Sequence, residues 1–91
     1  ASLLRHEPTP VVRLNHAVAL AEAGHLPTAL TQLAALGPEL DSYQPYHAAL
    51  AEYLSRSGSP DARAAYDRAI TLATNPADAA WLTQRRNRLL H

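Results

Sequence analysis

The histidines are the residues of this chain whose side chains could most readily hold a metal ion. The 91-residue sequence has five of them, His6, His16, His25, His47 and His91, spread over different predicted elements. Histidines that bind zinc from one helix stand four residues apart, and no pair here has that spacing. Although two of them, His16 and His47, could approach each other across helices, we predict ordinary packing or surface positions and no metal site.

Nucleophilic catalysis is the second chemistry that the residue types would allow. Serine, histidine and aspartate are all present, but no nucleophile elbow or comparable motif accompanies them. The chain has only three glycines and no glycine-rich loop that could cradle a phosphate group. We therefore expect no enzymatic activity, no cofactor and no small-molecule substrate.

The charge balance argues against direct binding of nucleic acid. Eight basic and eight acidic residues give a formal net charge of zero with the histidines neutral, whereas phosphate contacts require a basic face. One basic cluster, Arg85, Arg86 and Arg88, could contact an acidic surface, although its position favours a solvated helix face. The chain has no cysteine, which is compatible with a reducing cytoplasm, and no apolar run long enough to span a membrane. We expect a cytoplasmic protein without membrane contact.

The segment "SYQPYHAALAEYL" gathers three of the four tyrosines, Tyr43, Tyr46 and Tyr53, around one predicted helix. Tyrosine is common at protein interfaces because its ring is apolar and its hydroxyl can form a hydrogen bond. It serves equally well in a core, and we favour that interpretation for Tyr46 and Tyr53. A polar residue beside an apolar stripe, Asn15, could bind a neighbouring helix backbone or contact a partner.

Five prolines mark the helices that position these residues. They occur in "TPVV", "LPTA", "QPYH", "SPDA" and "NPAD", and proline suits the first turn of a helix. Thr9, Ser59 and Asn75 precede their prolines and are good N-cap residues, whereas Asp41 or Ser42 could cap the helix that contains Pro45. The predicted helices are 10–23, 27–37, 42–57, 60–73 and 76–90, after a helix remnant at 2–7.

Apolar residues recur every three or four positions along these segments, as in amphipathic helices. The first stripe consists of Val11, Leu14, Val18 and Ala21. Alanine and leucine dominate the composition, and both are strong helix formers. The connections are short, so neighbouring helices should run antiparallel. The sequence predicts an all-α domain.

An internal repeat organises the helices. Gly24 and Gly58 lie 34 residues apart, and "HAVALAEAG" aligns with "LAEYLSRSG" before them. After the glycines, Pro27 aligns with Pro60 at an offset of 33, because the second turn is one residue shorter. Two helices in a period near 34 residues are typical of tetratricopeptide repeats. We predict tetratricopeptide-like antiparallel helical hairpins, about two repeats plus a C-terminal capping helix.

The two ends of the chain also agree with the predicted repeat pattern. We expect residues 1–91 to be a single domain of a longer chain, divided into the tail of a preceding helix (1–8), repeat one (9–41), repeat two (42–75) and a capping helix (76–91). The last segment becomes polar after Trp81, as the outer face of a terminal helix should.

The first helices of the repeats, which commonly line a peptide groove, carry no lysine and asparagine clamp for a carboxylate. Repeat one instead presents an apolar face that two repeats cannot cover well, and exposed contiguous apolar surface usually indicates a partner. The candidate protein-interaction surface comprises Val11, Leu14, Asn15, Val18, Tyr43, Tyr46, His47 and Arg85.

Three segments, "LLRHEPTPVVRLNHAVALAEAG", "YQPYHAALAEYLSRSG" and "ARAAYDRAITLATNPADAAWLTQRR", carry a resemblance to one family. They resemble the C-terminal tetratricopeptide-like extension of a group of bacterial extracytoplasmic-function sigma factors. The resemblance spans essentially all 91 residues, whereas His16 departs from the arginine common at its position. Matching positions include Pro10, Val11, Val12, Leu14, Asn15, Ala17, Val18, Ala19, Tyr46, His47, Ala48, Tyr66, Ala69, Asn75 and Pro76.

The resemblance implies a function that composition cannot show. The parent protein would be a transcription initiation factor that directs RNA polymerase to promoters. This segment would be its regulatory or protein-interaction domain, packed on the upstream sigma domains of the same chain or on a protein such as RNA polymerase core. Promoter DNA would be contacted only by the other domains. The alternative is a free-standing tetratricopeptide adaptor that binds a peptide or protein partner.

Overall fold

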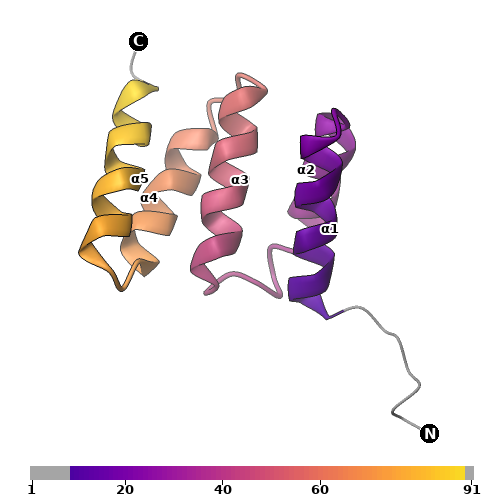
Figure 1. Cartoon of the computed structure of the whole chain (residues 1–91), viewed down its shortest axis with the longest axis horizontal. Helices are drawn as coiled ribbons and strands as arrows, with labels where there is room; N and C mark the ends of the chain where they lie inside the picture. The colour runs from indigo at the N-terminus through magenta and orange to yellow at the C-terminus, as the bar shows by residue number, and fades with distance from the viewer. Residues whose placement is uncertain (1–8, 90–91) are drawn as a thin grey trace, which may run out of the picture.

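The computed structural model describes residues 9–89, which form five α-helices and, within that range, no strand (Figure 1). The helices are α1 (Pro10–Glu22), α2 (Leu26–Ala35), α3 (Gln44–Arg56), α4 (Ala62–Leu72) and α5 (Pro76–Arg88). The predicted all-α fold class is therefore confirmed. The predicted helix remnant 2–7 and the end of the last helix at residue 90 lie outside the described residues.

Successive helices run antiparallel and stand side by side in a row (Figure 1). The α1 and α2 helices form a first hairpin, α3 and α4 form a second, and α5 packs against α4. The hairpins meet where α2 packs on α3. This is the predicted tetratricopeptide-like arrangement, two hairpins followed by one further helix.

Side-chain caps form at two of the predicted helix starts. The Thr9 hydroxyl oxygen accepts a hydrogen bond from the Val12 amide at 3.2 Å, and the Asn75 side-chain oxygen accepts from the Ala77 amide at 2.8 Å. Each satisfies an amide that has no partner within the helix. Because proline follows directly in both cases, the start of the helix is well specified by the local sequence.

The other two predicted caps are wrong. The α3 helix begins at Gln44 rather than 42, with Tyr43 at the N-cap position, because Pro45 must stand in the first turn. Asp41 therefore lies in the preceding connection and caps nothing. Ser59 also does not cap α4: its hydroxyl oxygen accepts from the Asp61 amide at 3.2 Å in a turn, and the helix begins at Ala62.

The two hairpin turns share one geometry, which supports the repeat. Gly24 and Gly58 have φ values of 97° and 77°, a backbone region that glycine adopts without strain. Five-residue-back hydrogen bonds follow both glycines, from the His25 amide to the Leu20 carbonyl at 2.9 Å and from the Ser59 amide to the Leu54 carbonyl at 3.0 Å. Such bonds terminate helices at a left-handed residue.

The core follows the repeat as well. Ala17 and its counterpart Ala51 are both fully buried, as are Leu33 and its counterpart Tyr66. Small residues on one helix and larger ones on its partner let the two helices of each hairpin approach closely. One buried cluster fills the first hairpin and its contact with α3: Leu14, Ala17, Ala21, Ala29, Leu33, Leu36, Leu40, Tyr46 and Tyr53. A second joins α3, α4 and α5: Ala51, Ala65, Tyr66, Ala69 and Leu82.

None of the helices between residues 9 and 89 has the length and apolar character required to cross a membrane.

Candidate protein-interaction site

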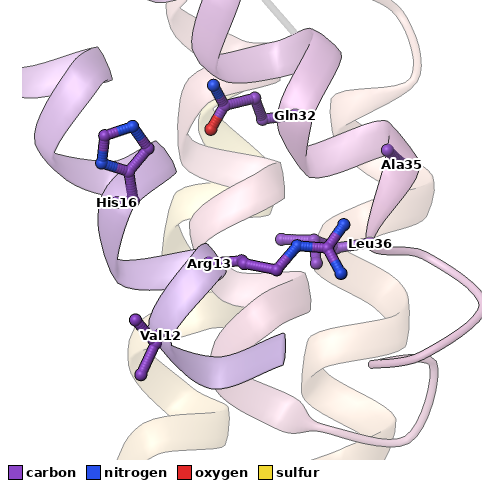
Figure 2. A pocket seen from close by; sticks show the side chains of 6 residues that line it. All are labelled: Val12, Arg13, His16, Gln32, Ala35 and Leu36. Carbon is purple, nitrogen blue, oxygen red and sulfur yellow. The ribbon is translucent and has the colours of Figure 1, made fainter. Parts of the chain in front are cut away.

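A groove opens on the first hairpin, between α1 and α2. We call it the first-hairpin groove; its volume is about 470 Å³. Its lining residues come from both helices (Figure 2) and are Val12, Arg13, His16, Gln32, Ala35 and Leu36. Only Leu36 among them is buried. The groove is therefore a largely apolar depression that the described residues leave uncovered.

Two valines of α1 are exposed at this groove, Val12 in its lining and Val11 next to it in the sequence. Val12 is 54% exposed and its neighbour Val11 is 38% exposed. Because both stand in the first turn of the helix, they could contact a partner without any change in the hairpin. Single exposed apolar residues are common, but two adjacent ones at the rim of a groove favour a docking surface.

Three of the eight predicted interface residues are instead part of the core. Leu14, Tyr46 and His47 are only 4%, 2% and 8% exposed, so none of them can meet a partner in this fold. For Leu14 the reason is that α2 covers the inner stripe of α1, which also buries Ala21. The predicted apolar face of the first repeat is therefore narrower than its sequence stripe.

Tyr46 and His47 are buried because α2 and its connection to α3 lie over them. The Tyr46 hydroxyl donates a hydrogen bond to the Leu33 carbonyl of α2 at 2.6 Å. The His47 Nε2–H group donates to the Asp41 carbonyl in the connection, also at 2.6 Å. Burial, with a smaller contribution from the charge of Asp41, raises the pKa of Tyr46. These two side chains hold the hairpins together.

The remaining predicted residues of α1 and of the N-cap of α3 differ in how exposed their side chains are. Asn15 is exposed, and so is Tyr43 at 37%. Val18 is half-buried against the first core cluster. None of these three lines the first-hairpin groove. Val11 and Asn15 are the exposed members of the predicted set that stand next to a groove residue in the sequence, Val12 and His16 respectively.

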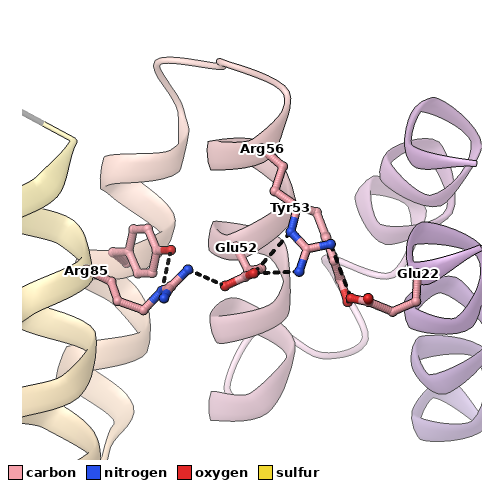
Figure 3. Close-up of polar contacts among 6 residues, drawn as sticks. Glu22, Glu52, Tyr53, Arg56 and Arg85 are labelled. Atoms are coloured by element: carbon pink, nitrogen blue, oxygen red, sulfur yellow. Dashed lines mark hydrogen bonds and ion pairs between the residues drawn. The ribbon is translucent and has the colours of Figure 1, made fainter. Parts of the chain in front are cut away.

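Arg85, the last predicted residue, belongs to a network of charges that joins three helices (Figure 3). Its guanidinium lies 2.9 Å from the Glu52 carboxylate of α3, and Arg56 contacts the same carboxylate at 2.7 Å. Arg56 also lies 3.3 Å from Glu22 of α1. We call Glu22, Arg56, Glu52 and Arg85 the charge ladder. Its arginines are satisfied within the chain, which leaves Arg85 little capacity for an acidic partner.

Aromatic rings support the charge ladder. The Tyr53 hydroxyl donates to Glu22 at 2.7 Å, and burial together with this hydrogen bond raises the pKa of Tyr53 to about 12. The guanidinium of Arg56 lies 5.0 Å from the centre of the Tyr53 ring, and that of Arg85 lies 4.9 Å from the centre of the exposed Trp81 ring. Because the ladder crosses α1, α3 and α5, polar side chains already pair where a tetratricopeptide peptide groove would lie.

The first-hairpin groove was missed by reasoning from the sequence. Its members Gln32 and Ala35 lie on the second helix of the repeat, whereas the search followed the first helices. The available signal was the repeat itself, because His16 aligns with Leu50 and Gln32 aligns with Ala65 at the offsets of 34 and 33 residues. Where a polar residue of one repeat aligns with an apolar residue of the other, the two hairpins have different neighbours at that position.

Among residues 9–89, no three histidine, aspartate or glutamate side chains lie close enough together to hold a metal ion. The histidines His16 and His47, which could have approached each other, have different environments: His16 is exposed at the groove and His47 is buried behind α2.

Comparison with known proteins gives one informative match. A protein of Rhizobium meliloti (strain 1021), named uncharacterized protein R00370, is 39% identical over 89 residues. The match covers 97% of this chain but 21% of the relative, so the chain spans about a fifth of the length of the protein that it matches. No protein-family model matches the chain, and no solved structure matches it.

Proposed function

We propose that this chain is the C-terminal protein-interaction domain of an extracytoplasmic-function sigma factor, and that it docks through the first-hairpin groove. The domain packs on the sigma domains of the same polypeptide or on a protein partner, in the cytoplasm where RNA polymerase acts. The sigma-factor part of the proposal rests on the resemblance of the sequence segments, and the observation that carries the docking part is the apolar groove that residues 9–89 leave uncovered between α1 and α2, lined by Val12 and adjoined by Val11. An edge of this kind is what a hairpin stack presents where a further element packs.

The distribution of charge supports a protein partner rather than DNA. Five of the seven arginines between residues 9 and 89 form ion pairs within the chain, namely Arg13, Arg56, Arg68, Arg85 and Arg86. Sequence-independent DNA affinity depends on many unpaired basic groups that face phosphate. The two arginines that remain are too few to form such a face.

The length of the Rhizobium meliloti relative also supports the proposal. The segment that matches this chain occupies about a fifth of that protein, so the homologous domain there is attached to a much longer polypeptide. A domain in that setting has a neighbour in the same chain, at a high effective concentration.

A free-standing adaptor that binds peptides along the first helices of its repeats is the alternative. The charge ladder makes this less favourable, because a peptide there would have to displace ion pairs that join α1, α3 and α5. Binding in the first-hairpin groove would remain open to such an adaptor.

A promoter reporter in the parent protein tests the proposal. We expect deletion of residues 1–91 to change promoter-driven transcription several-fold, and Val12→Asp to reproduce part of that change. Val12 is more than half exposed, so its substitution leaves the core intact. Ala77→Asp, also exposed in the first turn of a helix, is the matched control. Unchanged transcription after the deletion would exclude the proposed role.

A further inference from the structure

The repeat assigns every residue of the first-hairpin groove a counterpart on the second hairpin. Residues of α1 map onto α3 at an offset of 34, and residues of α2 map onto α4 at an offset of 33, as the shared turn geometry and buried positions require. The counterparts of Val12, Arg13 and His16 are Tyr46, His47 and Leu50, and those of Gln32, Ala35 and Leu36 are Ala65, Arg68 and Ala69.

On the second hairpin, α2 of the same chain packs against the α3 side of this counterpart surface. Leu30 and Ala34 of α2 line an open pocket together with four of the six counterparts, His47, Leu50, Ala65 and Arg68, so α2 borders the surface without filling it. A fifth counterpart, Tyr46, donates its hydroxyl to the backbone of α2 at Leu33. The contact of α2 with the second hairpin therefore shows which kind of element can pack against this surface of a hairpin.

Several of the counterpart residues are more buried than the matching groove residues, because α2 lies next to them. Val12 is 54% exposed, whereas its counterpart Tyr46 is 2% exposed beneath α2. Gln32 is half-buried and Ala35 exposed, whereas Ala65 is buried and Arg68 half-buried. The two surfaces have the same backbone architecture, and they differ in having a helix packed against one of them.

The connection between α2 and α3 also contacts the counterpart surface. Residues 36–43 connect α2 to the start of α3, and Asp41 in this connection accepts hydrogen bonds from His47 and Arg68, two members of the counterpart surface. The described residues begin at Thr9, the N-cap of α1, one turn before Val12. A segment joined ahead of Thr9 is therefore close to the groove in the sequence, as the connection before α3 is close to the counterpart surface.

We propose that the first-hairpin groove is the seat of a helix with the chemistry of α2, supplied by the polypeptide joined ahead of Thr9 in a longer protein. The helix presents leucine and alanine side chains four residues apart, as α2 presents Leu30 and Ala34. It runs antiparallel to α1, as α2 runs antiparallel to α3. This deepens the proposed function by naming the partner of the groove, and it holds whether or not the longer protein is a sigma factor.

An extended chain tests the proposal with a defined probe. A second copy of residues 26–42, which contains α2 and its connection, replaces residues 1–8 and is joined directly to Thr9. The chain has no cysteine, so Ala35→Cys places a single thiol in the groove. We expect the thiol to be alkylated at least about tenfold more slowly in the extended chain than in residues 1–91, because a seated helix must open before reagent enters.

Two controls make the result decisive. Ala80→Cys, on the exposed surface of α5 at the other end of the row, should be alkylated equally fast in both chains. Glutamate at the copied positions of Leu30 and Ala34 should restore the reactivity of Cys at position 35. Equal alkylation of that thiol in the extended chain and in residues 1–91 would overturn the proposal. That outcome is distinct from failure of the transcription reporter, which tests the parent protein.

Discussion

At the scale of single residues, tyrosine hydroxyls connect elements that are distant in the sequence. Tyr46 of α3 bonds to the backbone of α2, and Tyr53 of the same helix bonds to Glu22 of α1. Both rings are buried in the first core cluster, so each residue contributes apolar area and one specific polar contact. The preference for a core role of Tyr46 and Tyr53 is confirmed.

Tyr53→Phe should change how the free energy of unfolding depends on pH in the alkaline range. The folded-state pKa of Tyr53 is raised from 10.0 to about 12, so the folded chain holds the phenolic proton more tightly than the unfolded chain does. This contribution, about 3 kcal/mol at most, is fully present below pH 10 and is lost as the pH rises through 12. Chemical unfolding at several pH values measures it.

The control for that experiment is Tyr43→Phe, because Tyr43 is partly exposed and its hydroxyl has no hydrogen bond among the described residues. We expect the free energies of unfolding of the original chain and Tyr53→Phe to converge between pH 10 and 12. A constant difference across this range would show that the Tyr53 proton is not held by the fold.

At the scale of elements, close packing between the two helices of each hairpin depends on alanines at equivalent positions. Ala17 of α1 and Ala51 of α3 have no exposed surface. Protein interiors are packed as densely as organic crystals, so a larger side chain at such a position must displace a helix or adopt a strained rotamer.

Ala17→Leu should therefore lower the free energy of unfolding by about 1–3 kcal/mol through overpacking. Ala19→Leu in the same helix is the matched control, because Ala19 is exposed and the substitution is identical. Thermal or urea unfolding of both variants provides the measurement. If Ala17→Leu were as stable as the control, the assigned contact between α1 and α2 would be wrong.

Local sequence predicts the helices well but not the surface. Helix starts at Pro10 and Pro76 were specified by an N-cap residue followed by proline, an interaction contained within a few residues. The start of α3 was misplaced because Pro45 must stand in the first turn of the helix, which puts Tyr43 and not Asp41 at the N-cap position. The start of α4 was misplaced because the Ser59 hydroxyl accepts from the Asp61 amide two residues on, in a turn that precedes the helix.

The interface residues were predicted less well from the sequence than the helix starts. Leu14 and His47 were predicted to be available because each lies on an apolar or mixed helix face. Their burial is decided by which neighbouring helix covers that face, and a single stripe carries no such information. Comparison of the two repeats would have helped, because paired positions with different polarity mark the hairpin that lacks a neighbour.

At the scale of the whole molecule, the described residues form a row of helices (Figure 1). The first-hairpin groove lies on the hairpin at the start of this row. The charge ladder and the α2–α3 contact join the hairpins, whereas no element between residues 9 and 89 covers the outer surface of the first hairpin in the same way. Helix stacks of this kind depend on contacts between neighbouring units, so an uncovered end is the natural point of attachment.

Titration calorimetry of residues 1–91 with the rest of the parent polypeptide, prepared separately, measures that attachment most directly. We expect specific binding with a negative heat-capacity change, since apolar surface is buried. Val12→Asp should weaken the binding at least about tenfold, equivalent to about 1.4 kcal/mol, and Ala77→Asp should leave it unchanged. Binding that is equally strong for Val12→Asp and the original chain, or no binding at all, would contradict the assignment of the groove as the docking surface.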